Sequence, residues 1–232
     1  MVENKRYLTG PIGKQTRPKA VELRHVTVTQ KGQTLLHDLT LDVFEGESIA
    51  IVGKPGAGKS ALLACLQGLI QPTSGQILVM GSSLPPMTRK IRRQLGILPQ
   101  QLKHTPTDTV ADSLRRFASY YALKLSSEQI NAYSAHYHFS SATPVARLTE
   151  VQTRVLALAL ALLHDPRLVL LDEPLSDLAE PDLAEIWGHL QSMQREGRTL
   201  LSTFTLPVAD IHSNGYDMVV TLEQGKMVQR ER

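Results

Sequence analysis

The sequence has 232 residues, with 25 Lys plus Arg against 22 Asp plus Glu, and a pI of about 9.0. This length suits one domain, and a single cysteine, Cys65, excludes an internal disulfide and a cysteine-rich zinc site. The positive charge belongs to residues 1–20, which hold five basic residues and one acidic residue, whereas the rest of the chain holds 20 basic and 21 acidic. We therefore expect a flexible basic tail at 1–20, a nearly neutral domain at 21–232 and no nucleic-acid partner.

Strand and helix patterns then follow one another along the chain. A short apolar strand at 48–52 leads through a glycine-rich loop into a helix at 59–69, which is the opening unit of an α/β fold. The other predicted strands are 21–28, 35–43, 75–79, 95–98, 168–171, 199–203, 217–222 and 226–229. The other predicted helices are 109–121, 127–137, 150–163 and 181–196. We expect an α/β core with a small antiparallel β part and a helical insertion at about 103–163.

The glycine-rich loop matches the phosphate-binding pattern G-x-x-x-x-G-K-[ST]. Its backbone N–H groups and the following helix N-terminus favour phosphate, Lys59 is placed to reach the β- and γ-phosphates, and the Ser60 hydroxyl to ligate Mg²⁺. An ordinary surface loop is the alternative, but the strand before and the helix after it favour a nucleotide site. The predicted nucleotide-binding residues are Gly53, Lys54, Pro55, Gly56, Ala57, Gly58, Lys59, Ser60 and Ala61.

Two carboxylates, Asp172 and Glu173, directly follow the apolar run 168–171. Parallel sheets bind ligands at the carboxyl ends of their strands, so Asp172 is expected to hold Mg²⁺ through water and Glu173 to orient or polarise the attacking water. Alone, such a pair is usually a solvated strand end, and the phosphate loop favours the catalytic interpretation. Gln100 follows the strand 95–98 and is expected to touch Mg²⁺ or the water and report nucleotide state to the insertion.

These elements occur in the order typical of ATP-binding cassette (ABC) proteins, and residues 21–232 resemble their nucleotide-binding domain. The resemblance implies a P-loop NTPase with a RecA-like core, an antiparallel β subdomain and an inserted α-helical subdomain. It also implies Mg-ATP as ligand and Lys59, Gln100 and Glu173 as catalytic residues, with Mg²⁺ held by Ser60, Gln100 and Asp172. The segment 107–123 resembles the ATPases of ABC-2-type exporters, which work with separately encoded permeases.

That sub-family implies a cytoplasmic subunit at the inner face of the plasma membrane. Its expected partners are a membrane permease subunit and a second ABC ATPase chain, in a homodimer or a heterodimer. The N-terminus lacks the apolar segment of a secretory signal, and the apolar run 155–163 is too short to span a bilayer.

The family signature LSGGQ is degenerate in this chain. The corresponding residues are Leu148, Thr149, Glu150, Val151 and Gln152, so Glu and Val replace both glycines. Side chains there oppose close backbone approach to a partner's nucleotide, and a carboxylate repels phosphate. The favoured interpretation is local: Thr149 and Gln152 have the spacing of a capping box that starts the helix without a ligand.

Three other positions also depart from the family pattern. Phe204 aligns with the switch His, Ala179 with the Asp of the loop after the acid pair, and Gln30 with the aromatic residue that stacks on adenine. Two hypotheses follow: a transport ATPase subunit whose hydrolysis is impaired, or a catalytically silent subunit that pairs with an active ABC ATPase. A soluble ABC protein acting on nucleic acid is the third, and the nearly neutral body and 5% aromatic content oppose it.

Overall fold

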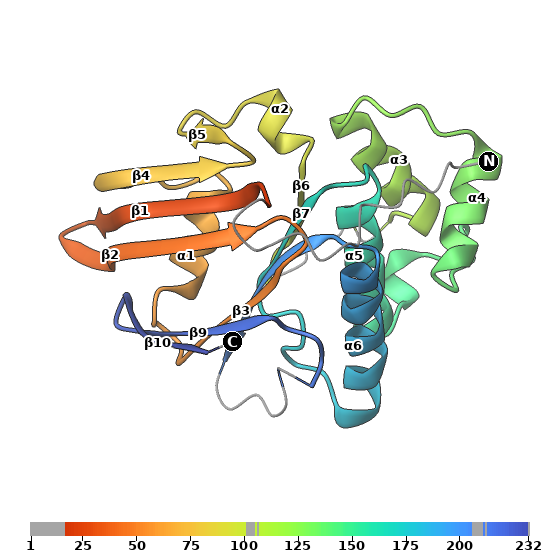
Figure 1. The fold of residues 1–232 in the computed structure, drawn as a ribbon. Coiled ribbons are helices and arrows are strands. Elements are labelled where there is room, and N and C mark those ends of the chain that lie inside the picture. Colours follow the sequence, from red (N-terminus) through yellow and green to blue (C-terminus); the bar gives the residue numbers. More distant parts are fainter. Residues whose placement is uncertain (1–16, 101–104, 106, 206–210, 212, 232) are drawn as a thin grey trace.

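The computed structural model describes residues 17–100, 105, 107–205, 211 and 213–231, which form two β-sheets and their covering helices (Figure 1). Of the tail predicted at 1–20, residues 1–16 lie outside the described residues. Residues 19 and 20 are part of β1 (Lys19–Gln30), which begins two residues before the domain boundary expected at 21. Ala20 is fully buried in that strand, so the ordered domain starts before the charge pattern indicates.

The smaller sheet is antiparallel and has the order β2-β1-β4-β5. Its remaining strands are β2 (Gln33–Phe44), β4 (Ser74–Val79) and β5 (Ser82–Leu84). β1 and β2 form a hairpin through Lys31 and Gly32, whose φ angles of 48° and 80° are those of a tight hairpin turn. Alternate residues of both strands are buried, which gives this sheet one face for the core.

The larger sheet has six strands in the order β10-β9-β3-β8-β7-β6. Its strands are β3 (Ser48–Gly53), β6 (Leu95–Leu98), β7 (Leu168–Leu171), β8 (Thr199–Thr205), β9 (Met218–Glu223) and β10 (Lys226–Glu231). All neighbouring pairs are parallel except the closing hairpin of β9 and β10. The carboxyl ends of β3, β8, β7 and β6 therefore meet at one edge, where the predicted site residues follow their strands.

Helix α1 (Lys59–Leu66) packs between the two sheets, and its Leu62, Leu63 and Leu66 join residues of both in one apolar cluster (Figure 1). Helices α5 (Glu150–Leu162) and α6 (Glu180–Arg195) pack on the other face of the larger sheet. Helices α3 (Val110–Tyr120) and α4 (Ser127–His136) lie beyond α5 (Figure 1). The connections contain the short helices α2 (Arg89–Arg92) and η1 (Val145–Arg147). None of the helices in the described ranges has the length and apolarity to cross a membrane.

Candidate functional site

The loop from Gly53 to Lys59 joins the end of β3 to the start of α1. Gly58 has a φ of 105°, and a Cβ there would lie 2.7 Å from the backbone oxygen of Leu35. A Cβ at Gly53 would lie 2.5 Å from the backbone oxygen of Leu222. Because neither position has room for a side chain, the two glycines allow this loop to pass close to β2 of the antiparallel sheet and β9 of the larger sheet.

The N-cap residue of α1, Gly58, provides no side-chain cap, and the first turn of α1 holds no acidic residue. Helices α3, α4 and α5 each begin with a capping box, and α6, which also lacks a side-chain cap, has Glu180 and Asp182 in its first turn. The first N–H groups of a helix have no partner within the helix and favour an anion. The start of α1 therefore fits a phosphate group, as the glycine pattern predicts.

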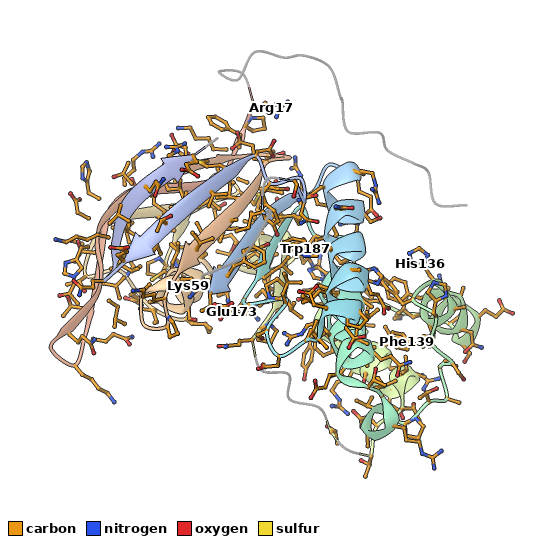
Figure 2. The ribbon with its side chains drawn as sticks, turned by 90° about the horizontal axis from the view of Figure 1, so that it is seen from below. Arg17, Lys59, His136, Phe139, Glu173 and Trp187 are labelled. Atoms are coloured by element: carbon orange, nitrogen blue, oxygen red, sulfur yellow. The ribbon has the colours of Figure 1, made fainter. Side chains whose placement is uncertain are left out.

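Lys59 connects this loop to the acid pair. Its Nζ donates to the backbone oxygen of Gly53 at 2.7 Å and lies 3.1 Å from Oε1 of Glu173. Both side chains are nearly buried, with 6% and 11% of their surfaces exposed. Figure 2 shows the two side chains close together at one edge of the sheet. The structure thus brings together two residues that are far apart in the sequence and that were both predicted to be catalytic.

Two threonines of β8 hold the acid pair. The Thr203 hydroxyl donates to Oδ1 of Asp172 at 2.7 Å and accepts from the backbone N–H of Glu173 at 2.9 Å. Thr205 donates its hydroxyl to Oε1 of Glu173 at 2.6 Å and its backbone N–H to Oε2 at 2.8 Å. Both contacts follow from the position of β8 between β3 and β7.

Sequence reasoning missed both threonines. The available signal was the Thr-x-Thr spacing at the end of a strand, which places both side chains on one face. The backbone of Glu173 has a φ of 49°, a left-handed conformation that residues other than glycine adopt rarely. The hydrogen bond from its N–H to Thr203 stabilises this turn and directs the carboxylate toward Lys59.

Phe204 lies on the other face of β8. It is 1% exposed and packs against Trp187 of α6 and against Tyr216, with ring centroids 5.7 Å and 5.6 Å away. Phe204 is the residue expected in place of the switch His, and its side chain belongs to an aromatic core cluster and not to the edge that carries Lys59. The residue of β8 that contacts Lys59 is Thr205, whose Oγ1 lies 3.3 Å from Nζ.

The expected Mg²⁺ ligands have the chemistry that this ion prefers. Ser60 is exposed in the first turn of α1, and Asp172 is half-buried after β7. A hydroxyl and a carboxylate fit a hard cation that keeps waters and phosphate oxygens as further ligands. Within the described part of the chain, no group of three His, Cys, Asp or Glu residues is arranged to hold a metal on its own.

Gln100 is exposed just after β6. Its backbone oxygen accepts from Nη1 of Arg154 at 3.5 Å, and its side chain has no hydrogen bond to any residue that the structure describes. Arg154, in α5, also donates to the backbone oxygen of Ser176 at 3.2 Å. Burial lowers the pKa of this guanidinium from its ordinary value, and nearby acidic groups oppose the shift. Arg154 thus joins the segments after β6 and β7.

The degenerate signature forms the predicted capping box. The N–H of Gln152 donates to Oγ1 of Thr149 at 3.3 Å, and the N–H of Thr149 donates to Oε1 of Gln152 at 3.1 Å. Glu150 is exposed, whereas Val151 is 8% exposed and packs in the core of the helical region. The capping prediction is confirmed, because these polar side chains satisfy the backbone at the start of α5.

The other two departures from the family pattern are exposed. Ala179 precedes α6 without a side-chain cap, and Gln30 ends β1.

The comparisons with known proteins agree with this geometry. The family model of the ABC transporter matches residues 36–176. The chain is 30% identical over 222 residues to the Nod factor export ATP-binding protein I of Neorhizobium galegae, covering 94% of this chain and 63% of that protein. For the Rhizobium meliloti protein of the same name, identity is 30% over 234 residues, covering 96% and 69%.

Solved structures share the fold. A dimeric ATP-binding cassette in a post-hydrolysis state, bound to ADP and Pi, has a TM-score of 0.79 and 23% identity, covering 91% of this chain and 98% of that one. The cbiO1 subunit from Clostridium perfringens, part of the cbiONQ transporter complex, has a TM-score of 0.77 and 24% identity, covering 92% and 88%. The chain therefore belongs to the ABC transporter family and has the P-loop NTPase fold of its cassettes.

Within that family it is an ATP-binding subunit, and the curated relatives above are named as ATP-binding proteins.

Proposed function

We propose that this chain binds Mg-ATP in the 53–60 loop and couples nucleotide-driven dimerisation to a separate membrane permease. The observation that carries the proposal is the Lys59 ammonium, which lies between the uncapped start of α1 and the carboxylate of Glu173. A cation in this position meets a triphosphate that enters along the helix axis. The relatives named for Nod factor export favour an exporter.

Each site residue has a defined task in this proposal. The loop from Gly53 to Gly58 and the first N–H groups of α1 surround the β-phosphate, while Lys59 turns from Glu173 toward the β- and γ-phosphates. Ser60, Asp172 and Gln100 supply oxygens for Mg²⁺, which neutralises charge on the phosphates when bound. Glu173 accepts the proton of the attacking water at a carboxylate oxygen, and the Thr203 hydroxyl, which donates to Oδ1, holds the Asp172 carboxylate in place.

Dimerisation follows from the family's head-to-tail arrangement, in which each nucleotide lies between one chain's phosphate loop and its partner's signature. In such a dimer, the start of α5 would present to the partner the exposed carboxylate of Glu150 and the Thr149 hydroxyl that caps the helix. Repulsion between Glu150 and a γ-phosphate would slow turnover at the partner's site. We therefore propose that hydrolysis is impaired at the site completed by this chain, and that the subunit works at the cytoplasmic face of the plasma membrane.

The exposed carboxylate of Glu150 at the start of α5 also supports a second candidate function, a catalytically silent subunit paired with an active ABC ATPase. In that role the chain binds Mg-ATP structurally, and its partner supplies the competent signature. The two candidates predict different companions: a permease alone for the first, and a permease with a second ABC ATPase for the second.

Purification of the tagged full chain from solubilised membranes tests both. Mg-ATP binding and steady-state hydrolysis are measured on the chain alone and on whatever co-purifies, with Glu173→Gln in parallel. A permease and turnover that Glu173→Gln abolishes support the first function. A second ATPase and turnover that Glu173→Gln leaves unchanged support the silent subunit, and absence of Mg-ATP binding contradicts both.

A further inference from the structure

The end of β8 contacts the carboxylate of Glu173 through a single residue. Thr205 donates its hydroxyl to Oε1 and its backbone N–H to Oε2, so both oxygens of the carboxylate have a donor from the same residue. Two donors at fixed positions orient the plane of a carboxylate as well as its location. Thr205 therefore determines which way the carboxylate of Glu173 points.

The two hydrogen bonds from Thr205 matter most when the Lys59 ammonium moves away from Glu173. In the structure Oε1 is shared by the Lys59 ammonium, at 3.1 Å, and the Thr205 hydroxyl, at 2.6 Å. Once the ammonium binds a phosphate, Thr205 is the side chain that still donates to Oε1. A carboxylate that loses one of its two hydrogen-bond partners keeps its direction only if the other partner is held in place. Thr205 is held by its pairing with Gly53 of β3.

The neighbouring residue cannot do this task. Phe204 lies against Trp187 and Tyr216 on the opposite face of β8, and it has no polar atom on its side chain. Strand alternation gives the site-facing positions to Thr203 and Thr205. Register supports this assignment, because Thr205 pairs with Gly53, the first residue of the phosphate loop.

We propose that Thr205 is the positioning residue for Glu173 in ATP hydrolysis, and that its hydroxyl replaces the switch His that the family pattern places at residue 204. The proposal rests on the proposed function, because it requires that Glu173 acts on a water beside bound Mg-ATP. Thr205 acts through Glu173 and takes no proton from the substrate.

Two substitutions separate the hydroxyl from the rest of the residue. Thr205→Val keeps the shape and the backbone N–H but removes the donor to Oε1, whereas Thr205→Ser keeps that donor. Thr34→Val is the matched control, because it removes a half-buried strand hydroxyl, which lies 3.2 Å from the Thr29 hydroxyl, from β2 in the other sheet. Steady-state kcat and KM for Mg-ATP are measured on the complex purified from membranes, and Trp187 fluorescence verifies folding.

We expect Thr205→Val to lower kcat roughly 10- to 100-fold, the usual cost of misplacing a reacting group. KM and the affinity for Mg-ATP change little, since Lys59 loses only its long 3.3 Å contact with Oγ1 of Thr205 and keeps its hydrogen bond to the Gly53 oxygen. Thr205→Ser and Thr34→Val keep kcat near the wild-type value. A change in KM without a change in kcat, or a serine variant as slow as the valine variant, would overturn the role.

The wild-type complex provides the remaining distinction. If it binds Mg-ATP but does not hydrolyse it, the role of Thr205 is wrong while nucleotide binding stands. If the wild-type chain does not bind Mg-ATP at all, the proposed function itself fails.

Discussion

The ammonium of Lys59 and the carboxylate of Glu173 form an ion pair, with Nζ 3.1 Å from Oε1 and both side chains nearly buried. The pair joins the residue expected to bind phosphate to the residue expected to act on water. Bound phosphate would compete with Glu173 for the Lys59 ammonium. Without nucleotide, the residue proposed as the base, Glu173, is therefore paired with the residue proposed to bind phosphate, Lys59. This competition has a measurable consequence.

Substitution of Glu173 by Gln is expected to tighten binding of a non-hydrolysable ATP analogue with Mg²⁺. The amide oxygen can still accept one of the two hydrogen bonds that Thr205 donates, but the neutral side chain neither holds the Lys59 ammonium as strongly nor repels the phosphates. We expect an affinity gain of roughly 10-fold, or about 1.4 kcal/mol. Isothermal titration calorimetry on the wild type, on Glu173→Gln and on Glu223→Gln, an exposed control at the end of β9, measures it. Unchanged or weaker binding by Glu173→Gln would mean that the ion pair does not compete.

Restoring the family residue at 204 is expected to destabilise the chain. Phe204→His would bury an imidazole among Trp187 and Tyr216, where a fully enclosed apolar ring now packs. Lost packing together with a buried polar group should cost about 2–4 kcal/mol in the free energy of unfolding. Urea denaturation measures the loss, and Phe204→Leu, which keeps the position apolar, should lose less. A histidine variant that is as stable as the wild type and hydrolyses ATP faster would place residue 204 in the site.

The sequence predicted most of the fold because its signals are local. The apolar runs that became β3 and β7 are buried on both faces, and the glycine pattern identified Lys59 without any three-dimensional information. β5 was missed because three residues are too few to show a period. The N-terminal boundary was predicted at 21 from composition, charge and apolar periodicity, which do not reveal that Lys19 pairs with Phe44 of β2.

The site was harder to predict than the fold because it depends on strand order and side-chain direction. The family pattern leads one to expect a switch His at residue 204, but only the pleat of β8 shows that the Phe204 side chain faces α6. The grip of Thr205 on Glu173 requires β8 to lie between β3 and β7, which no local pattern reveals. The capping box at Thr149 was predictable because its two partners are three residues apart.

Comparing the capping boxes of α5 and α4 distinguishes two possible roles of the Thr149 hydroxyl, stabilising its helix and contacting a partner's nucleotide. Thr149→Ala and Ser126→Ala each remove a hydroxyl that accepts from the third helical N–H, in α5 and α4 respectively. Each should cost about 1 kcal/mol in the free energy of unfolding. Denaturant titration compares the two variants, and the turnover of the purified complex is recorded beside it. If Thr149→Ala, unlike Ser126→Ala, also lowers turnover, the Thr149 hydroxyl serves the partner's nucleotide as well as its own helix.

His164 gives the chain a predictable pH dependence. Burial lowers its pKa below the ordinary value of 6.5, even though Nε2 lies 2.9 Å from the backbone oxygen of Leu95, and its ring stacks on Tyr121. Below pH 6.5 the unfolded chain therefore binds a proton that the folded chain does not, so the free energy of unfolding falls as pH decreases toward the folded pKa.

Urea denaturation between pH 7 and pH 5 tests this dependence. His164→Phe keeps the stacked ring without a titratable group, so the decrease in stability with falling pH should become smaller. The exposed His136 offers the matched control, His136→Gln. His189, whose pKa is also lowered by burial, should supply part of the slope that remains. An unaltered slope in His164→Phe would show that another group determines the pH dependence.

The proposed role of Lys59 is to bind the phosphates of Mg-ATP. Its most direct test is the equilibrium dissociation constant for the non-hydrolysable analogue with Mg²⁺, measured on the wild type, on Lys59→Met and on Lys226→Met, an exposed control on β10. Loss of charged hydrogen bonds to phosphate should weaken binding by about 1.5–3 kcal/mol, roughly 10- to 100-fold, in Lys59→Met. The control should bind as the wild type does. Equal affinity in the wild type and in Lys59→Met would contradict the claim.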